Sequence, residues 1–399
     1  MIGARVLVVG GGPAALSAAE ELRRLGFSGE LTVVAEEPRP PYDRTACSKD
    51  VLTGRRRPSE VVLSSGYPNQ IGWRHGGRAV AVDTEARTVV TDAGRTYHYD
   101  GLVVATGTRP VLPLGWVPGA PGLHTVHGLA DVEPLRYDLR RAGRVVVVGA
   151  GLIGCEVAYG VRSLLRECVL VDSSPQVLSR AIGDCVGGLV TQEMRADGIP
   201  MWLGRTVESV INVGDHWQVE LDDGEIIDAD VVVATMGERP DTSWLSGTGL
   251  DLVDGIRCDP ALRVVETDGR LVDGVVAAGS VARWPNLRYG TRLTRYGQWV
   301  SARDQGRAAA RSLLDPDPPP VTLVPRFWSQ LGDVRIQVAG EWPDDADVTV
   351  TAVEPGRRDA RSGVLLSYTV DGRPVGLVAL NAPSVFAESA RFLCAAAQS

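Results

Sequence analysis

Two glycine-rich turns of the same design, far apart in the sequence, constrain this chain most. The first, GGGPAA, contains Gly10, Gly12 and Ala15. The second, GAGLIG, contains Gly149, Gly151 and Gly154. Each turn follows a run of valines and leucines and opens into a stretch of small residues, which is the strand, loop and helix context of a dinucleotide-binding turn. The repeat therefore predicts two nucleotide sites, with the phosphates at two helix N-termini.

An acidic residue follows each glycine turn at the expected spacing. The apolar run 31–34 leads to Glu36 and Glu37, and the run 168–171 leads to Asp172. A carboxylate roughly 20 residues after such a turn accepts hydrogen bonds from a ribose diol. Asp172 would repel a 2′-phosphate, and the two serines that follow it provide no compensating arginine, so the sequence favours NADH over NADPH.

The duplication extends beyond the glycine turns. Ala105, Thr106 and Gly107 end one apolar strand and lead to Arg109, and the segment 231–240 repeats this ending with Gly237. We expect an α/β protein with two Rossmann-like dinucleotide-binding domains and a small C-terminal α+β domain. The expected boundaries are 1–113 with 241–320 for a discontinuous first domain, 114–240 for the second, and 321–399 for the third.

Composition excludes several classes of function. A net charge of −8 argues against nucleic acid as a partner. No apolar run is long enough to span a membrane, and no signal peptide is evident, so we expect a cytoplasmic protein without a membrane partner. The six cysteines form no CxxC or CxxxxC pair. We therefore expect no redox disulfide and no metal site.

Basic residues are unevenly distributed. Lys49 is the only lysine among 41 basic residues, which suggests that a compact ammonium is needed there. Six arginines between 288 and 311 have only Asp304 among them as an opposing charge, and residues 55–57 are all arginine. On an acidic protein, such a basic face could guide an acidic partner.

These motifs resemble the FAD- and NAD-dependent ferredoxin reductases of oxygenase systems, within the pyridine nucleotide-disulfide oxidoreductase superfamily and without its redox disulfide. The resemblance spans essentially the whole chain. The segments that carry it are 41–44 (PYDR) with 48–49 (SK), 105–110 (ATGTRP), 149–156 (GAGLIGCE) and 325–329 (PRFWS).

The resemblance implies specific roles. Glu36 or Glu37 would hold the ADP part of FAD, and Arg44 and Lys49 would lie along the flavin. Glu156 would pair with Lys49 near the reactive edge of the flavin, and these two are the expected catalytic residues. The remaining expected cofactor-binding residues are Gly10, Gly12, Ala15, Ala105, Thr106, Gly107, Arg109, Gly149, Gly151, Gly154, Asp172, Gly237, Gly279, Ser280, Trp299 and Trp328.

Three positions depart from the family pattern around the expected flavin. Ser280 and Gln330 stand where aspartates are usual, and Gly297 stands where a glutamate is usual. A neutral hydrogen bond is roughly half as strong as a charge-assisted one, so FAD would bind more weakly.

The resemblance implies that NADH passes a hydride to FAD, which then delivers single electrons to an iron–sulfur ferredoxin serving a P450 or other oxygenase. A monomer or homodimer is expected. One alternative is a flavin-dependent NADH oxidase or small-molecule reductase, with Cys47 as its only candidate thiol. Two others are a repurposed flavoprotein with weakened FAD binding and a nucleotide-binding protein that has lost its flavin.

Overall fold

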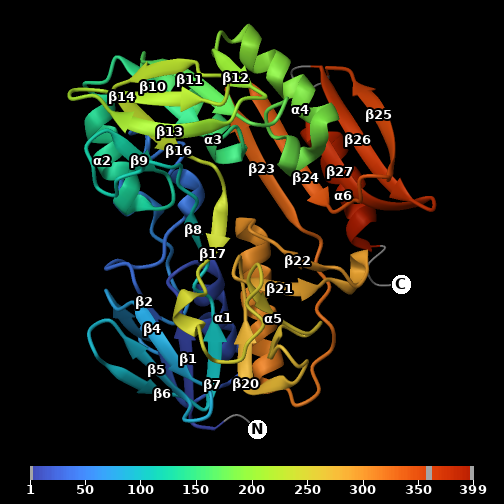
Figure 1. Ribbon diagram of the computed structural model, residues 1–399. Coiled ribbons are helices and arrows are strands. Elements are labelled where there is room, and N and C mark those ends of the chain that lie inside the picture. The colour runs from blue at the N-terminus through green and yellow to red at the C-terminus, as the bar shows by residue number, and fades with distance from the viewer. Residues whose placement is uncertain (1–2, 356–361, 396–399) are drawn as a thin grey trace.

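The computed structural model describes residues 3–355 and 362–395. Figure 1 shows one sheet-based unit below, a second above it, and a third beside the second. The α/β class expected from the sequence is confirmed. Within the described residues, every helix is too short or too polar to cross a membrane.

The first unit is built on a six-stranded sheet with the order β19-β20-β7-β1-β2-β3. All neighbours are parallel except β19 and β20. The strands are β1 (Arg5–Val9), β2 (Glu30–Ala35), β3 (Gly72–His75), β7 (Gly101–Val104), β19 (Arg263–Val265) and β20 (Leu271–Ala277). Because β20 pairs with β7, residues far apart in the sequence complete one sheet.

The second unit repeats this plan with a five-stranded sheet of order β12-β11-β10-β16-β9, parallel throughout. Its strands are β9 (Leu123–Thr125), β10 (Arg144–Val148), β11 (Glu167–Asp172), β12 (Met201–Leu203) and β16 (Val231–Ala234). Its helices are α2 (Leu129–Leu139), α3 (Leu152–Ser163) and α4 (Ser179–Ala196). Strand β10 lies between β11 and β16 as β1 lies between β2 and β7, so the repeat is one of topology as well as sequence.

Smaller antiparallel sheets and single 3-10 turns decorate these two units. The sheets contain β4 (Ala79–Asp83), β5 (Thr88–Thr91) and β6 (Thr96–His98); β13 (Val207–Asn212), β14 (Trp217–Leu221) and β15 (Ile226–Ala229); and β18 (Ile256–Arg257), β21 (Ala282–Pro285) and β22 (Leu293–Arg295), of which β18 and β21 run parallel. The turns are η1 (Arg44–Ala46), η2 (Pro58–Val61), η3 (Ser243–Leu245) and η4 (Leu287–Tyr289).

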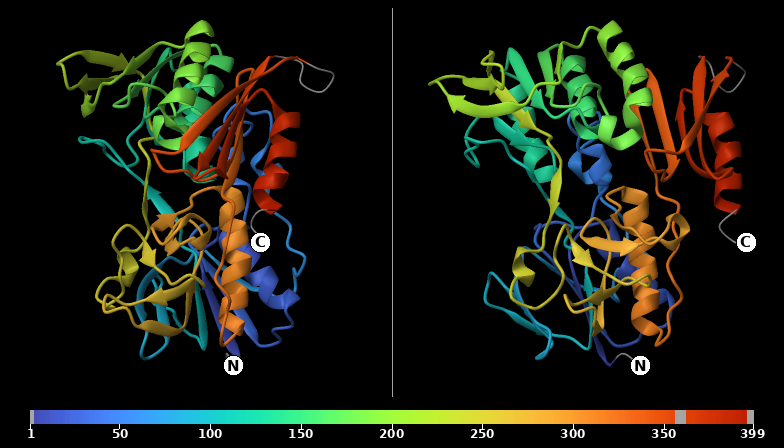
Figure 2. Two further views of the ribbon diagram at one scale, coloured as in Figure 1. Left: turned by 90° about the vertical axis from the view of Figure 1, so that its right-hand side faces the viewer. Right: turned by 45° about the vertical axis from the view of Figure 1, so that its right-hand side comes forward.

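The third unit is an antiparallel sheet of order β23-β24-β27-β26-β25. Its strands are β23 (Arg326–Leu331), β24 (Val334–Gly340), β25 (Asp347–Val353), β26 (Gly363–Val370) and β27 (Arg373–Leu380). Helix α6 (Pro383–Ala395) lies along this sheet, as both views in Figure 2 show. The sequence also predicts a final helix over about residues 384–397, and the last two of these residues fall outside the described ones.

Two short strands connect the first and second units. β8 (Thr108–Pro110) leaves the first unit and β17 (Glu238–Pro240) returns to it, and they pair antiparallel with Arg109 opposite Arg239. The Arg-Pro endings that repeat in the sequence are therefore neighbours in space (Figure 1).

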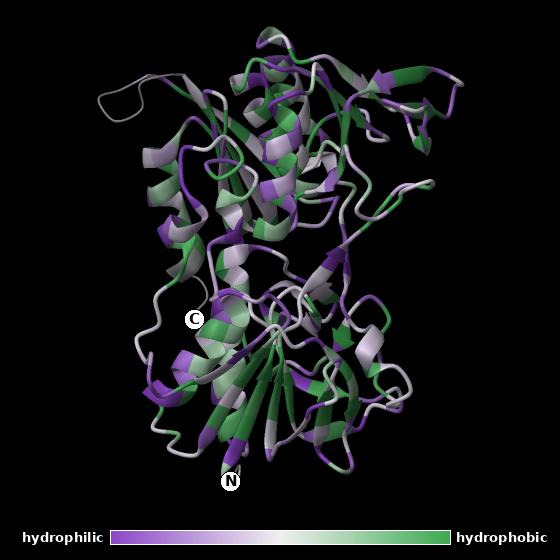
Figure 3. Ribbon diagram, turned by 90° about the vertical axis from the view of Figure 1, so that its left-hand side faces the viewer, coloured by the Kyte–Doolittle hydropathy of each residue, from purple (hydrophilic) through white to green (hydrophobic). Residues whose placement is uncertain are grey.

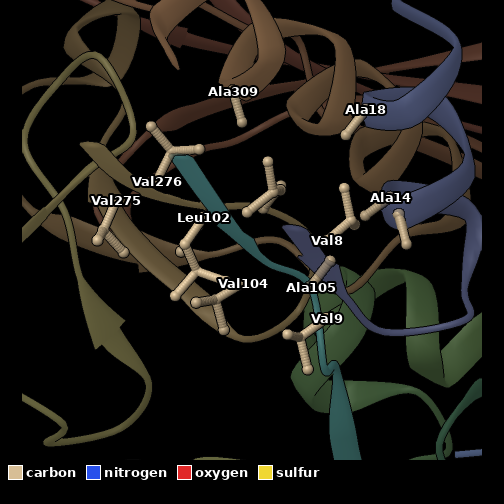
Figure 4. Packing of buried hydrophobic residues seen from close by; sticks show 14 of the residues in the cluster. Val8, Val9, Ala14, Ala18, Leu102, Val104, Ala105, Val275, Val276 and Ala309 are labelled. Atoms are coloured by element: carbon tan, nitrogen blue, oxygen red, sulfur yellow. The ribbon is translucent and has the colours of Figure 1, made fainter. Parts of the chain in front are cut away.

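Helices α1 (Pro13–Arg24) and α5 (Trp299–Leu314) pack closely against each other beside the first sheet. The strands of the first sheet are strongly apolar (Figure 3). Figure 4 shows Ala18 of α1 and Ala309 of α5 packed over the apolar side chains of this sheet. A Cβ at Gly306 would lie 2.2 Å from the backbone oxygen of Ala14. The absence of a side chain at Gly306 is therefore what lets the two helices approach.

We expect Gly306→Ala to destabilise the protein by about 1–3 kcal/mol, because overpacking forces the two helix backbones apart. Gly188→Ala, in α4, is the matched control: its Cβ would meet no atom closer than 3.9 Å. That change should stabilise by up to about 1 kcal/mol, since alanine favours a helix more than glycine does. Urea unfolding followed by circular dichroism measures both, and equal stabilities would contradict this account of the packing.

Candidate functional site

A large cavity of about 1350 Å³ opens where the three units meet. Both glycine turns line it, together with the residues that follow β2, β7, β11 and β16. The carboxyl ends of the two parallel sheets thus open into the same space, which is where ligands bind in folds of this kind. The cavity exceeds the usual size of a site for one small molecule.

The first glycine turn is shaped for close approach of a ligand to the backbone. The amide of Gly10 donates to the carbonyl of Val34 at 2.8 Å, and its φ of +135° is a conformation that favours glycine. A Cβ at Gly10 would lie 2.1 Å from the oxygen of Ala105. Gly12 is the N-cap of α1, with open space where its Cβ would be. Its surroundings therefore fit a diphosphate at the helix N-terminus.

The second turn has the same geometry. The amide of Gly149 donates to the carbonyl of Val171 at 2.7 Å, with φ of +108°. Gly151 caps α3 and has open space beside it, while a Cβ at Gly154 would lie 1.8 Å from the oxygen of Gly149. Gly154 and the buried Ala15 do not line the cavity. They allow the helix to pack near its strand, and the other predicted site residues all line the cavity.

Asp172 is held in place by backbone amides at the end of β11. Its two carboxylate oxygens accept hydrogen bonds from the amides of Ala150, at 2.6 Å, and Ser174, at 2.7 Å. A carboxylate has about four lone-pair positions, so it can still accept bonds from a ribose diol.

The structure separates the two glutamates that the sequence left as alternatives. Glu36 forms an ion pair with Arg109, which also pairs with Asp241 at 2.9 Å. Arg109 lies on β8, so this cluster joins the end of β2 to both connecting strands. Glu36 is half-exposed in the cavity and is the more accessible acid.

Glu37 instead belongs to a contact between units. It accepts a hydrogen bond from the hydroxyl of Tyr42 at 2.7 Å and pairs with Arg44. The Tyr42 hydroxyl accepts from the amide of Leu129, and Arg44 donates to the carbonyl of His127 at 2.9 Å. Arg44 lines the cavity, and its guanidinium also holds the segment that leads into α2.

Glu156 lies at the meeting point of all three units. Its carboxylate, with a side chain 2% exposed, pairs with Lys49 at 2.6 Å. Ser48 of the first unit and Ser329 of the third both donate hydrogen bonds to it. The expected pair of Lys49 and Glu156 thus forms, and the two serines complete the shell of donors around the buried charge.

The remaining expected residues line the same cavity in two groups. Ala105, Thr106, Gly107 and Gly237 lie where the connecting strands meet, and Thr106 donates to the carbonyl of Asp241 at 2.9 Å. Gly279, Ser280 and Trp299 lie near α5, and Trp328 lies on β23 of the third unit. The Gly279 amide donates to the side chain of Gln305 at 3.0 Å, and Trp328 is 60% exposed.

Sequence reasoning missed several residues of the site. Ser48 and Ser329 stand inside motifs that were recognised, but nothing local shows that both reach Glu156. Glu238, Arg180 and Arg205 also line the cavity. They come from separate elements, and no spacing rule connects them.

Thiol and metal chemistry find little support here. Cys47 is 2% exposed, and burial raises the pKa of its thiol to about 12, so almost no reactive thiolate forms near neutral pH. It does not line the cavity, although Ser48 next to it does. Among the residues described, no group of three or more His, Cys, Asp or Glu side chains could hold a metal ion.

We expect Ser329→Ala to destabilise the protein by about 1.5–3 kcal/mol, because it removes a hydrogen bond to a buried charge. Ser246→Ala is the control: the Ser246 hydroxyl donates to a carbonyl at an exposed turn. That change should stay within about 0.5 kcal/mol of the parent. Guanidinium unfolding compares the two, and an equal response would rule out a supporting role for Ser329.

The chain is similar to curated oxygenase-system proteins over almost its entire length. It is 33% identical to the anthranilate 1,2-dioxygenase system ferredoxin–NAD(+) reductase component of Burkholderia cepacia, covering 98% of this chain and 94% of that protein. It is 27% identical to the p-cumate 2,3-dioxygenase system ferredoxin–NAD(+) reductase component of Pseudomonas putida, covering 98% and 93%.

Solved structures agree in fold. The covalent putidaredoxin reductase–putidaredoxin complex matches with a TM-score of 0.87 and 26% identity, over 98% of this chain and 93% of that one. The ferredoxin reductase for the CYP199A2 system of Rhodopseudomonas palustris matches with a TM-score of 0.86 and 27% identity, over 97% and 94%. The family model for pyridine nucleotide-disulphide oxidoreductases matches residues 4–306. The chain belongs to the pyridine nucleotide-disulphide oxidoreductase family.

Proposed function

We propose that this protein is an NADH-dependent ferredoxin reductase that holds FAD and passes electrons singly to an iron–sulfur ferredoxin serving a P450 or other oxygenase. The observation that carries the proposal is the one cavity lined by both glycine turns, with Lys49 and Glu156 between them. Two nucleotides in one space can bring a reduced nicotinamide to a flavin.

Each unit has its own task in this proposal. Residues 1–113 with 241–320 hold FAD, with its diphosphate at the N-terminus of α1 and its ribose near Glu36. Residues 114–240 hold NADH, with its diphosphate at the N-terminus of α3 and its ribose at Asp172. Residues 321–399 cover the flavin through Trp328.

The chain's own residues position the reactants. FAD, when bound, supplies the acceptance of hydride and the release of single electrons. Lys49 presents a fixed positive charge in the cavity, because Glu156 holds its ammonium and the two serines hold Glu156. A buried pair of this kind fails when one partner is removed, since the other charge then lacks compensation.

The partner is an acidic ferredoxin that approaches the exposed Trp328. Arg326 lies on the same strand, and Arg335 is paired with Gln330 across β23 and β24. The arginine-rich stretch from 288 to 311 carries less uncompensated positive charge than its sequence suggests. Its arginines also pair with acids from outside that stretch: Glu21, Asp254 and Glu341.

We propose that the protein is cytoplasmic and is a monomer or homodimer.

Three alternatives predict different behaviour. An NADH oxidase or small-molecule reductase would not need a ferredoxin, and a thiol-linked enzyme would need Cys47, whose burial and raised pKa speak against it. A protein that has lost its flavin would purify colourless. A repurposed flavoprotein would be yellow and inactive with every ferredoxin.

Purified protein should be yellow, with flavin bands bleached by NADH under nitrogen, and should carry electrons from NADH through a [2Fe–2S] ferredoxin to cytochrome c.

Lys49→Met should slow anaerobic bleaching of the flavin bands at least about tenfold, since the paired charge is lost. Cys47→Ser should stay within about twofold of the parent. Turnover that ignores added ferredoxin, or that disappears with Cys47→Ser, would reject the proposal.

Ser280 offers a separate test of the flavin site. Ser280→Asp should tighten FAD binding by about tenfold, because a charge-assisted hydrogen bond replaces a neutral one. Ser246→Asp, at an exposed turn away from the cavity, should leave FAD affinity unchanged. Fluorescence titration of apoprotein with FAD gives both values, and binding by Ser280→Asp no tighter than that of the parent would contradict a hydrogen bond from this position to FAD.

A further inference from the structure

The rim of the cavity beside Asp172 contains an arginine that the sequence does not place there. Strands β11 and β12 are parallel neighbours, with Asp172 opposite Leu203. Beyond the strand ends, the amide of Gly204 donates to the carbonyl of Ser174 at 2.9 Å, and that of Arg205 donates to the carbonyl of Asp172 at 3.0 Å. Arg205 therefore lies directly beside the expected ribose-binding acid, and both line the cavity (β11 and β12 in Figure 1).

A second arginine, Arg180, lines the same cavity. Arg180 lies in the first turn of α4 and is exposed. Asp172, Asp223, Arg180 and Arg205 together carry no net charge. The two arginines thus offset the negative charge that Asp172 alone would present to a phosphate.

The guanidinium of Arg205 is available to a ligand. Its partner is Asp223, at 2.9 Å, and the two side chains are 43% and 31% exposed. Exposed pairs of this kind contribute little to stability, so Arg205 can turn toward a phosphate at small cost. Asp172 already accepts two backbone amides, which stabilise its charge. The hydroxyls of Ser173 and Ser174 add donors on the same rim.

We propose that Arg205, with Arg180 and the two serines, forms a subsite for a 2′-phosphate on the adenine ribose, so that the second unit binds NADPH as well as NADH. An arginine fork suits a phosphate because it donates two parallel hydrogen bonds. This inference rests on the proposed function of the second unit. It corrects the expectation from sequence that no arginine offsets Asp172.

The test compares two probes that differ only in the 2′-phosphate: adenosine 5′-monophosphate and adenosine 2′,5′-bisphosphate. Calorimetric titration of the purified holoenzyme measures their dissociation constants without turnover. The bisphosphate should bind within about tenfold of the monophosphate. Arg205→Gln should weaken the bisphosphate by about tenfold or more, because a charge-assisted hydrogen bond is lost, and should leave the monophosphate unchanged.

Arg144→Gln is the matched control. Arg144 also forms a partly exposed ion pair, with Glu167 at 3.1 Å, but lies at the opposite end of the same sheet and outside the cavity lining. It should change neither constant. The inference falls if the parent binds the bisphosphate more than about a hundredfold more weakly than the monophosphate, or if Arg205→Gln weakens both probes equally. Failure to bind even the monophosphate would overturn the nucleotide site of the second unit as well.

Discussion

One buried carboxylate, that of Glu156, links the three units of this protein. It lies on α3 of the second unit, and its donors come from Ser48 and Lys49 of the first and Ser329 of the third. Burying a charge is costly unless it is paired and hydrogen-bonded. The charge is therefore best compensated only when all three units are in place, which couples the assembly of the fold to the geometry of the cavity.

The two parallel sheets face one another because the chain crosses between them twice at adjacent points. Strands β8 and β17 pair side by side, and Arg109 on β8 joins Glu36 to Asp241. Each glycine turn follows the central strand of its sheet, so both turns open toward the same cavity. A second brace, from Glu37 through Tyr42 and Arg44 to the start of α2, holds the units in this orientation.

Several arginines of this chain form ion pairs that join separate elements of the fold. Arg311 joins α5 to Glu21 of α1, Arg292 reaches Glu341 of the third unit, and Arg295 pairs with Asp254. Because guanidinium donates several hydrogen bonds in fixed directions, it can tie elements together while keeping its charge. The one lysine stands where a compact charge is held against Glu156, and Arg205 lies beside Asp172 at the cavity, where its guanidinium pairs with Asp223.

Local sequence determined the features that depend on local geometry. Gly10 and Gly149 need positive φ, Gly154 needs a missing side chain, and the acids follow their strands at a spacing that the βαβ unit sets, so motif reasoning found them. Only the tertiary structure decided that Glu36 pairs with Arg109 whereas Glu37 pairs with Arg44. It also decided that Ser48 and Ser329 share Glu156, and that Arg205 lies beside Asp172. These contacts join residues from different elements, and neither periodicity nor spacing encodes where separate elements meet; that is set by how the sheets and helices pack.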